Sequence, residues 1–170
     1  MKKEVPLKNY VILGVVILCT VALVFYMRSW YNTSKEYYAQ NSVMTDVVRE
    51  IKSEEISNYT LENQKFILYV SSGQDANIKS FEDEFKGLIQ NLDLSEEVLY
   101  MNLDGVDSTS FYDLLRGFAS NSKIKEQISS SSASMYVFTD GKITGLLNDV
   151  NNYSVKRLET IIDRWGINNA

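Results

Sequence analysis

The apolar and polar positions divide the chain into one long apolar segment and a following series of short elements. Residues 10–27, YVILGVVILCTVALVFYM, carry no charge over 18 positions. A helix of that length spans about 27 Å, close to the hydrocarbon thickness of a bilayer. The pattern predicts a transmembrane helix over 10–27, an N-terminal segment over 1–9 and a juxtamembrane stalk over 28–43.

Three other interpretations of the apolar segment are weaker. A cleaved signal peptide needs small residues after the apolar run, but residues 25–28 are Phe-Tyr-Met-Arg. A lipoprotein signal needs a small residue before its cysteine, and Leu18 precedes Cys19. A buried core helix rarely stays apolar on every face for this length. We therefore expect an uncleaved anchor in contact with membrane lipid.

The charges around the apolar segment predict its orientation. Lys2, Lys3 and Lys8 precede it, and basic residues favour the cytoplasmic side of a membrane. The N-terminus is then expected in the cytoplasm. The domain over 44–170 is expected outside it, at the cell membrane.

The start of this domain shows helical spacing. Met44, Val47, Val48 and Ile51 follow the i, i+3, i+4, i+7 pattern of an amphipathic helix. This pattern predicts a first helix over residues 45–52.

A buried strand followed by a helix comes next. Residues 66–70, FILYV, are a continuous apolar run, typical of a strand buried on both faces. Ser71-Ser72-Gly73 ends the run. Apolar residues then recur at helical spacing, at Ile78, Phe81, Phe85, Leu88, Ile89 and Leu92.

The remaining elements are shorter. The pattern predicts strands over 98–103, 135–139 and 143–147, helices over 111–118 and 155–165, and a serine-rich loop over 129–134. Asp140-Gly141 is a two-residue hairpin signal between the last two strands. Since strands joined by helices pair in parallel, the order predicts an α/β fold with a four-stranded mixed sheet and helices on both faces.

This order resembles the thioredoxin-like superfamily over residues 44–165. The segments that carry the resemblance are ENQKFILYV, FEDEF, VLYMNLD and MYVFTDGKITGLL. Within the superfamily they are most similar to membrane-anchored bacteriocin transport accessory proteins of Gram-positive bacteria. The resemblance implies an extracytoplasmic accessory role in peptide export, although a fold alone does not fix a function.

The resemblance also implies a Cys-x-x-C motif and a cis-proline, and this chain has neither. Aligned on Phe81, the cysteine positions fall at Asp75 and Ile78, and the proline position falls near Ala133. Neither Asp75 nor Ile78 can form a disulfide or supply a reactive thiolate. We therefore expect no thiol chemistry at this position.

The same end of the fold is the expected binding site. In active relatives it grips extended peptide, partly through the backbone, and a degenerate version would hold a segment without oxidising it. The candidate residues are Ser72, Gly73, Gln74, Asp75, Asn77, Ile78, Ser132, Ala133 and Ser134. The expected partner is a protein or peptide, such as an exporter.

Composition narrows the remaining chemistry. The chain has no histidine, one cysteine and one proline, Pro6, so the commonest base and metal ligand are missing and no intrachain disulfide can form. Residues 29–170 hold 13 basic and 21 acidic residues, a net charge of −8, which disfavours nucleic acid as a partner. No catalytic residue, metal site or cofactor is predicted.

Two acidic clusters have simpler interpretations than a site. Glu82, Asp83 and Glu84 are adjacent, so they do not share one helix face, and we expect a solvated surface there. Residues 104–107, DGVD, lack the alternating ligands and terminal glutamate of a calcium loop, and we expect a turn at a strand end.

Three functional hypotheses follow. The favoured one is a non-enzymatic binding module held at the membrane. The second is a structural subunit of a membrane complex, in which the transmembrane helix and the stalk make the contacts. The third is an enzyme without a recognisable motif, or a redox helper that uses a partner's cysteines.

Overall fold

The computed structural model describes residues 7–40, 43–73 and 76–167. The chain divides into two units along the sequence, residues 1–40 and residues 41–170. Each unit is described by itself.

The first unit contains the helix α1, Leu7–Gln40. Its part Lys8–Trp30, 23 residues, is long and apolar enough to cross a membrane, and none of it is buried in the protein. At 1.5 Å per residue this part extends about 35 Å. The predicted apolar helix is confirmed, and the helix continues beyond the apolar run to Gln40. These properties fit a membrane anchor and a signal sequence alike.

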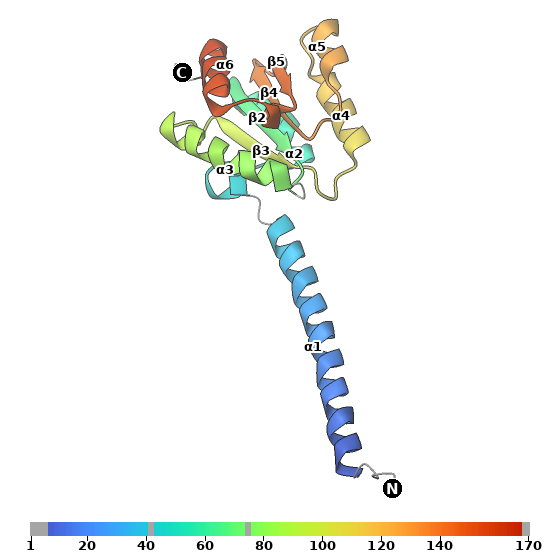
Figure 1. Cartoon of the computed structure of the whole chain (residues 1–170). Helices are drawn as coiled ribbons and strands as arrows, with labels where there is room; N and C mark the ends of the chain where they lie inside the picture. The colour runs from blue at the N-terminus through green and yellow to red at the C-terminus, as the bar shows by residue number, and fades with distance from the viewer. Residues whose placement is uncertain (1–6, 41–42, 74–75, 168–170) are drawn as a thin grey trace. The chain divides into compact units, whose positions relative to one another are not determined.

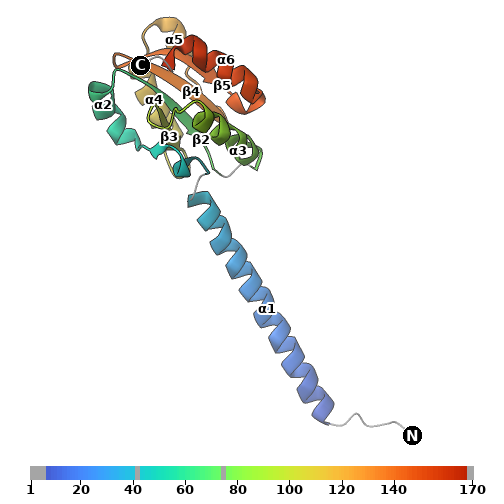
Figure 2. The same ribbon diagram turned by 90° about the vertical axis from the view of Figure 1, so that its left-hand side faces the viewer.

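The second unit is built on a five-stranded mixed sheet, visible in Figures 1 and 2. Its strands are β1 (Arg49–Glu50), β2 (Lys65–Ser71), β3 (Val98–Asn102), β4 (Ala133–Thr139) and β5 (Lys142–Asn148). They lie in the order β1-β3-β2-β4-β5. β3 pairs in parallel with both β1 and β2, whereas β4 pairs antiparallel with β2 and β5. The predicted mixed sheet is thus confirmed, with β1 as an additional short edge strand.

Helices cover both faces of the sheet. Figure 1 shows α3 (Ala76–Asn91) and α6 (Val155–Trp165) on one side, and α4 (Ser108–Gly117) and α5 (Ser122–Gln127) on the other. The helix α2 (Ser53–Glu62) packs on the side of α4, because its Ile56 belongs to the same apolar cluster as Phe111. Side chains of β2 alternate between the two clusters, which explains its continuous apolar run.

The hairpin between β4 and β5 forms as the sequence predicts. Asp140 and Gly141 have φ values of 49° and 73°, as a two-residue type I′ turn requires. This turn lies at the opposite end of β4 from Ala133.

The predicted first helix over 45–52 is wrong. The structure has a 3₁₀ segment η1 (Val43–Asp46), then β1, then α2. Val48 packs into the cluster on the α3 side and Ile51 into the cluster on the α4 side. One amphipathic helix cannot present residues three apart to opposite faces of a sheet, so an extended segment replaces it.

Two further differences concern the segment before β4. The helix α5 was not predicted, because its six residues contribute one buried apolar side chain, Ile124. Ala133, expected inside the serine-rich loop, is the first residue of β4 and is fully buried. A second 3₁₀ segment, η2 (Val150–Asn152), links β5 to α6.

Candidate functional site

The turn after β2 and the serine-rich segment before β4 meet at one end of the sheet. Because β2 and β4 are antiparallel, Ser71 pairs with Ala133, and Val70 pairs with Ser134. The end of one strand therefore lies beside the start of the other. This confirms that the two predicted halves of the candidate site are neighbours.

Asp104, which follows β3, fixes the turn after β2. Its Oδ1 accepts a hydrogen bond of 2.6 Å from the Ser72 hydroxyl, and its Oδ2 accepts one of 3.1 Å from the Gly73 amide. The Leu103 amide also donates to the Ser71 carbonyl at 2.9 Å. The Ser72 hydroxyl and the Gly73 amide are thus engaged inside the protein. The sequence does not reveal this role, because the pattern 104–107 is typical of an ordinary turn at a strand end.

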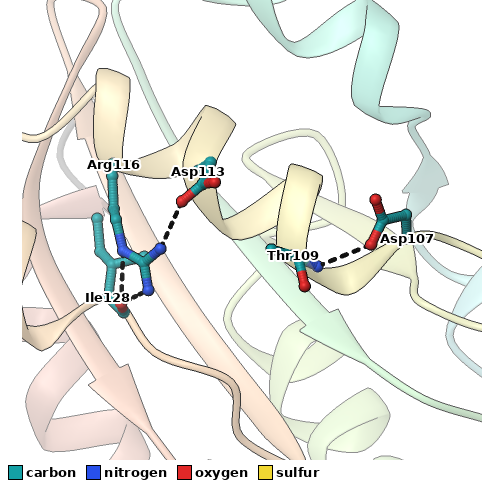
Figure 3. Close-up of polar contacts among 5 residues, drawn as sticks. All are labelled: Asp107, Thr109, Asp113, Arg116 and Ile128. Carbon is teal, nitrogen blue, oxygen red and sulfur yellow. Dashed lines mark hydrogen bonds and ion pairs between the residues drawn. The ribbon is translucent and has the colours of Figure 1, made fainter.

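The segment before β4 is held at both of its ends. Arg116 donates from Nε and Nη2 to the Ile128 carbonyl, at 3.2 and 3.0 Å, as Figure 3 shows. At the other end, the Ser131 and Ser134 hydroxyls are hydrogen-bonded at 2.5 Å. The Ser134 hydroxyl also lies 3.2 Å from Asn148 Oδ1 on β5. Between these ties, the segment keeps a defined path next to the β2 turn.

Ser132 differs from its neighbours in this segment. It is exposed, whereas Ser131 is half-buried and Ala133 is buried. It directly precedes Ala133, where the ladder between β2 and β4 begins. Ser132 is therefore an exposed residue at the point where the sheet ends.

The other predicted site residues are distributed between surface and core. Asn77 is exposed, Ser72 is half-buried, and Gly73 is buried. The side chains of Ile78, Ala133 and Ser134 are fully buried, so they support the fold instead of facing a ligand. Gln74 and Asp75 lie outside the described residues. A ligand at this end would therefore meet Asn77, Ser132 and backbone groups.

Glu82 corrects the expectation of a solvated acidic face on α3. Asp83 and Glu84 are exposed, but Glu82 is fully buried. Its Oε1 accepts hydrogen bonds from the Ser71 hydroxyl at 2.6 Å and the Tyr69 hydroxyl at 3.0 Å. Its Oε2 has no hydrogen-bond partner among the described residues. A carboxyl group thus lies directly beneath the end of β2.

Burial determines the ionisation of this group. It raises the pKa of Glu82, and the hydrogen bonds from Ser71 and Tyr69 and the charge of Lys79 offset only part of that effect. Burial, with Glu82 nearby, also raises the pKa of Tyr69 well above its ordinary value, so the phenol stays protonated and acts as a donor.

The chemistry available at this end is limited to hydroxyl, amide and carboxyl groups. The chain's one cysteine, Cys19, lies in α1. Ile78, at the second expected cysteine position, is a buried core residue. Within the described parts of the chain, no three histidine, cysteine or acidic side chains gather as metal ligands would.

Comparison with known proteins identifies the fold class. No protein-family model and no curated protein matches the chain. Solved structures do match, and they place the second unit in the thioredoxin-like fold class.

Two thioredoxin structures illustrate the similarity. The complex of ferredoxin:thioredoxin reductase with thioredoxin f2 matches over 74% of this chain and 99% of the matched chain, with 11% identity and a TM-score of 0.52. Mitochondrial thioredoxin 3 from Saccharomyces cerevisiae matches over 71% and 97%, with 16% identity and a TM-score of 0.49. At these identities the similarity shows the fold and carries no activity with it.

Proposed function

We propose that this protein is a membrane-anchored binding module that holds an extended segment of a protein partner at the end of its sheet without thiol chemistry. The observation that carries the proposal is Ser132. This residue is exposed and directly precedes Ala133, the first residue of β4. An extended segment laid beside it would gain main-chain hydrogen bonds, as in other modes of strand addition.

The hydrogen bonds of the segments next to Ser132 support this proposal. Asp104 fixes the turn after β2, and Arg116 holds the carbonyl of Ile128 at the start of the serine-rich segment. A surface that is ordered before binding loses less conformational entropy when a ligand docks. Preorganised loops at the end of the sheet therefore favour binding over a purely structural role.

The distribution of cysteine supports a function without redox chemistry. Thiol–disulfide exchange between a dithiol protein and its substrate needs two cysteines that approach each other. The full chain contains one, and it lies in the apolar part of α1. A dithiol redox role would thus need at least one reactive thiol from another protein.

The proposed location follows from α1. An apolar helix without a small-residue cleavage site is expected to remain as an anchor. The basic residues before it favour a cytoplasmic N-terminus and an extracytoplasmic second unit. The sequence resemblance to bacteriocin transport accessory proteins favours an exporter or an exported peptide as the partner.

Site-specific photocrosslinking in membranes tests the proposal. A photoreactive residue at Ser132 should capture a partner protein. The same residue at Lys142, which is exposed beside the hairpin at the opposite end of β4, should not. Equal capture from the two positions would contradict the proposed site.

An exchange of α1 separates binding from the structural alternative. If residues 10–27 are replaced by an unrelated apolar helix, capture from Ser132 should persist, because the second unit carries the site. Loss of capture, with the protein still in the membrane, would instead favour a structural subunit whose helix makes the contacts.

A further inference from the structure

A groove lies between α2 and the start of α4, beside the candidate site. It encloses about 510 Å³, within the range of ligand pockets. Val106, Phe111 and Leu114 supply its apolar surface. One wall is the loop that begins at Gly105, directly after the Asp104 carboxylate that fixes the β2 turn. The groove and the candidate site therefore share one loop.

The charged side chains that line the groove are both acidic, Glu54 from α2 and Asp107 from the shared loop. Both are exposed. Within 7–40, 43–73 and 76–167, the ion pairs join Lys86 to Asp46 and Arg116 to Asp113, so neither groove acid has a basic partner there. Two acids without counter-ions next to an apolar surface match a side chain with an apolar stem and a cationic head.

The geometry of Asp107 keeps its charge in place. It is the N-cap of α4, and its Oδ1 accepts from the Thr109 amide at 3.1 Å, as Figure 3 shows. The Ser110 hydroxyl donates to Oδ2 at 2.6 Å. These two bonds, that from Ser110 first, lower the pKa of Asp107 and favour its carboxylate form.

We propose that this groove takes a lysine or arginine side chain of the bound partner, so that the partner segment is basic. The inference rests on the proposed function and specifies the partner's chemistry. Charge supports it in two ways. Residues 29–170 carry a net charge of −8, and the groove places two acids beside an apolar surface, neither of which pairs with a basic side chain among the described residues.

Nuclear magnetic resonance of the full chain in lipid nanodiscs tests the groove. The probe is N-acetyl-arginine methylamide, and its uncharged isostere N-acetyl-citrulline methylamide is the comparison. The arginine compound should give saturable shifts of the Val106 and Leu114 methyl signals at millimolar concentration. The citrulline compound should bind at least fivefold more weakly. Equal binding of the two compounds would overturn the inference.

Matched variants locate the effect. The double variant Glu54→Gln, Asp107→Asn should weaken arginine binding at least fivefold, while asparagine still caps α4. Glu96→Gln removes an exposed acid before β3, at the far end of that strand, and should change nothing. Unchanged binding by the double variant, or equal loss in Glu96→Gln, would overturn the assignment.

The two proposals fail separately. If Ser132 captures a partner and the arginine compound shows no preference over citrulline, the groove assignment is wrong and the binding function stands. If the arginine compound binds in the groove and Ser132 captures nothing, the proposed function is wrong.

Discussion

Glu82 shows how one residue escapes a pattern that places its neighbours correctly. Three consecutive acids on α3 suggest solvent, and Asp83 and Glu84 are indeed exposed. Glu82 follows Phe81 at the edge of the apolar stripe of α3, and its carboxyl contacts side chains of β2. Tyr69 and Ser71 lie two residues apart on β2, so their side chains share one face of the sheet. Both hydroxyls donate to the Glu82 carboxyl. Two hydroxyl side chains on one face of a buried strand indicate a polar partner inside the protein. That Glu82 is this partner depends on tertiary packing, which the local sequence does not show.

Replacement of Glu82 should reveal a pH dependence. A carboxyl whose pKa folding raises contributes its full stability below the ordinary value of 4.5 and loses it as pH rises through the raised pKa. The free energy of unfolding of the wild type, relative to Glu82→Gln, should therefore fall as the pH rises above 4.5 and level off above the raised pKa. The fall amounts to about 1.4 kcal/mol for each tenfold difference between the ionisation constants of Glu82 in the folded and unfolded states. Urea unfolding in detergent micelles measures it.

The control for this experiment is Glu84→Gln, which removes an exposed acid from the same helix. Its difference from the wild type should vary little with pH. If the difference in unfolding free energy between the wild type and Glu82→Gln did not change with pH, the buried carboxyl would have an ordinary pKa.

Removal of the Asp104 carboxylate should loosen the turn after β2. Asp104→Ala loses the bonds to Ser72 and Gly73, and bonds to a charged group contribute about 2 kcal/mol. Urea unfolding should show a loss of that order, and the Gly73 amide should exchange faster with solvent. Asp113→Ala, which breaks an exposed ion pair with Arg116, should cost less than about 1 kcal/mol. Equal effects of the two variants would argue against the role of Asp104.

At the scale of elements, the sequence predicts those that carry a strong period. The apolar run of β2, the stripe of α3 and the Asp140-Gly141 turn each specify one structure. The segment 43–62 does not. Its apolar residues divide between two faces of the sheet, a division that depends on the parallel pairing of β1 with β3. Long-range pairing of this kind leaves no local pattern.

The helix α1 provides a prediction at this scale. Leu18 lies near the middle of Lys8–Trp30. An arginine at the centre of a spanning helix costs about 3 kcal/mol on insertion scales. Leu18→Arg should therefore reduce the fraction of protein that stays with membranes after an alkaline carbonate wash, and Leu18→Phe should not. Full retention of Leu18→Arg would contradict a membrane-spanning role.

At the scale of the whole molecule, the fold was predictable and the site only partly so. The order of elements is enough for a thioredoxin-like sheet, and it brings the β2 turn beside the serine-rich segment. It does not say which side chains face outward. Ile78 and Ala133 proved to be core residues, while Ser132 and Asn77 are exposed. Exposure depends on packing across the sheet, which the spacing of a motif does not encode.

Photocrosslinking in a chain without cysteine distinguishes binding at the sheet end from thiol chemistry. Cys19→Ser removes the only thiol, and a photoreactive residue replaces Ser132 or, as the control, Lys142. We expect capture of one partner from Ser132, with the same yield in wild-type and Cys19→Ser backgrounds, and none from Lys142. Equal capture from both positions, or loss of capture with Cys19→Ser, would contradict binding at the sheet end without thiol chemistry.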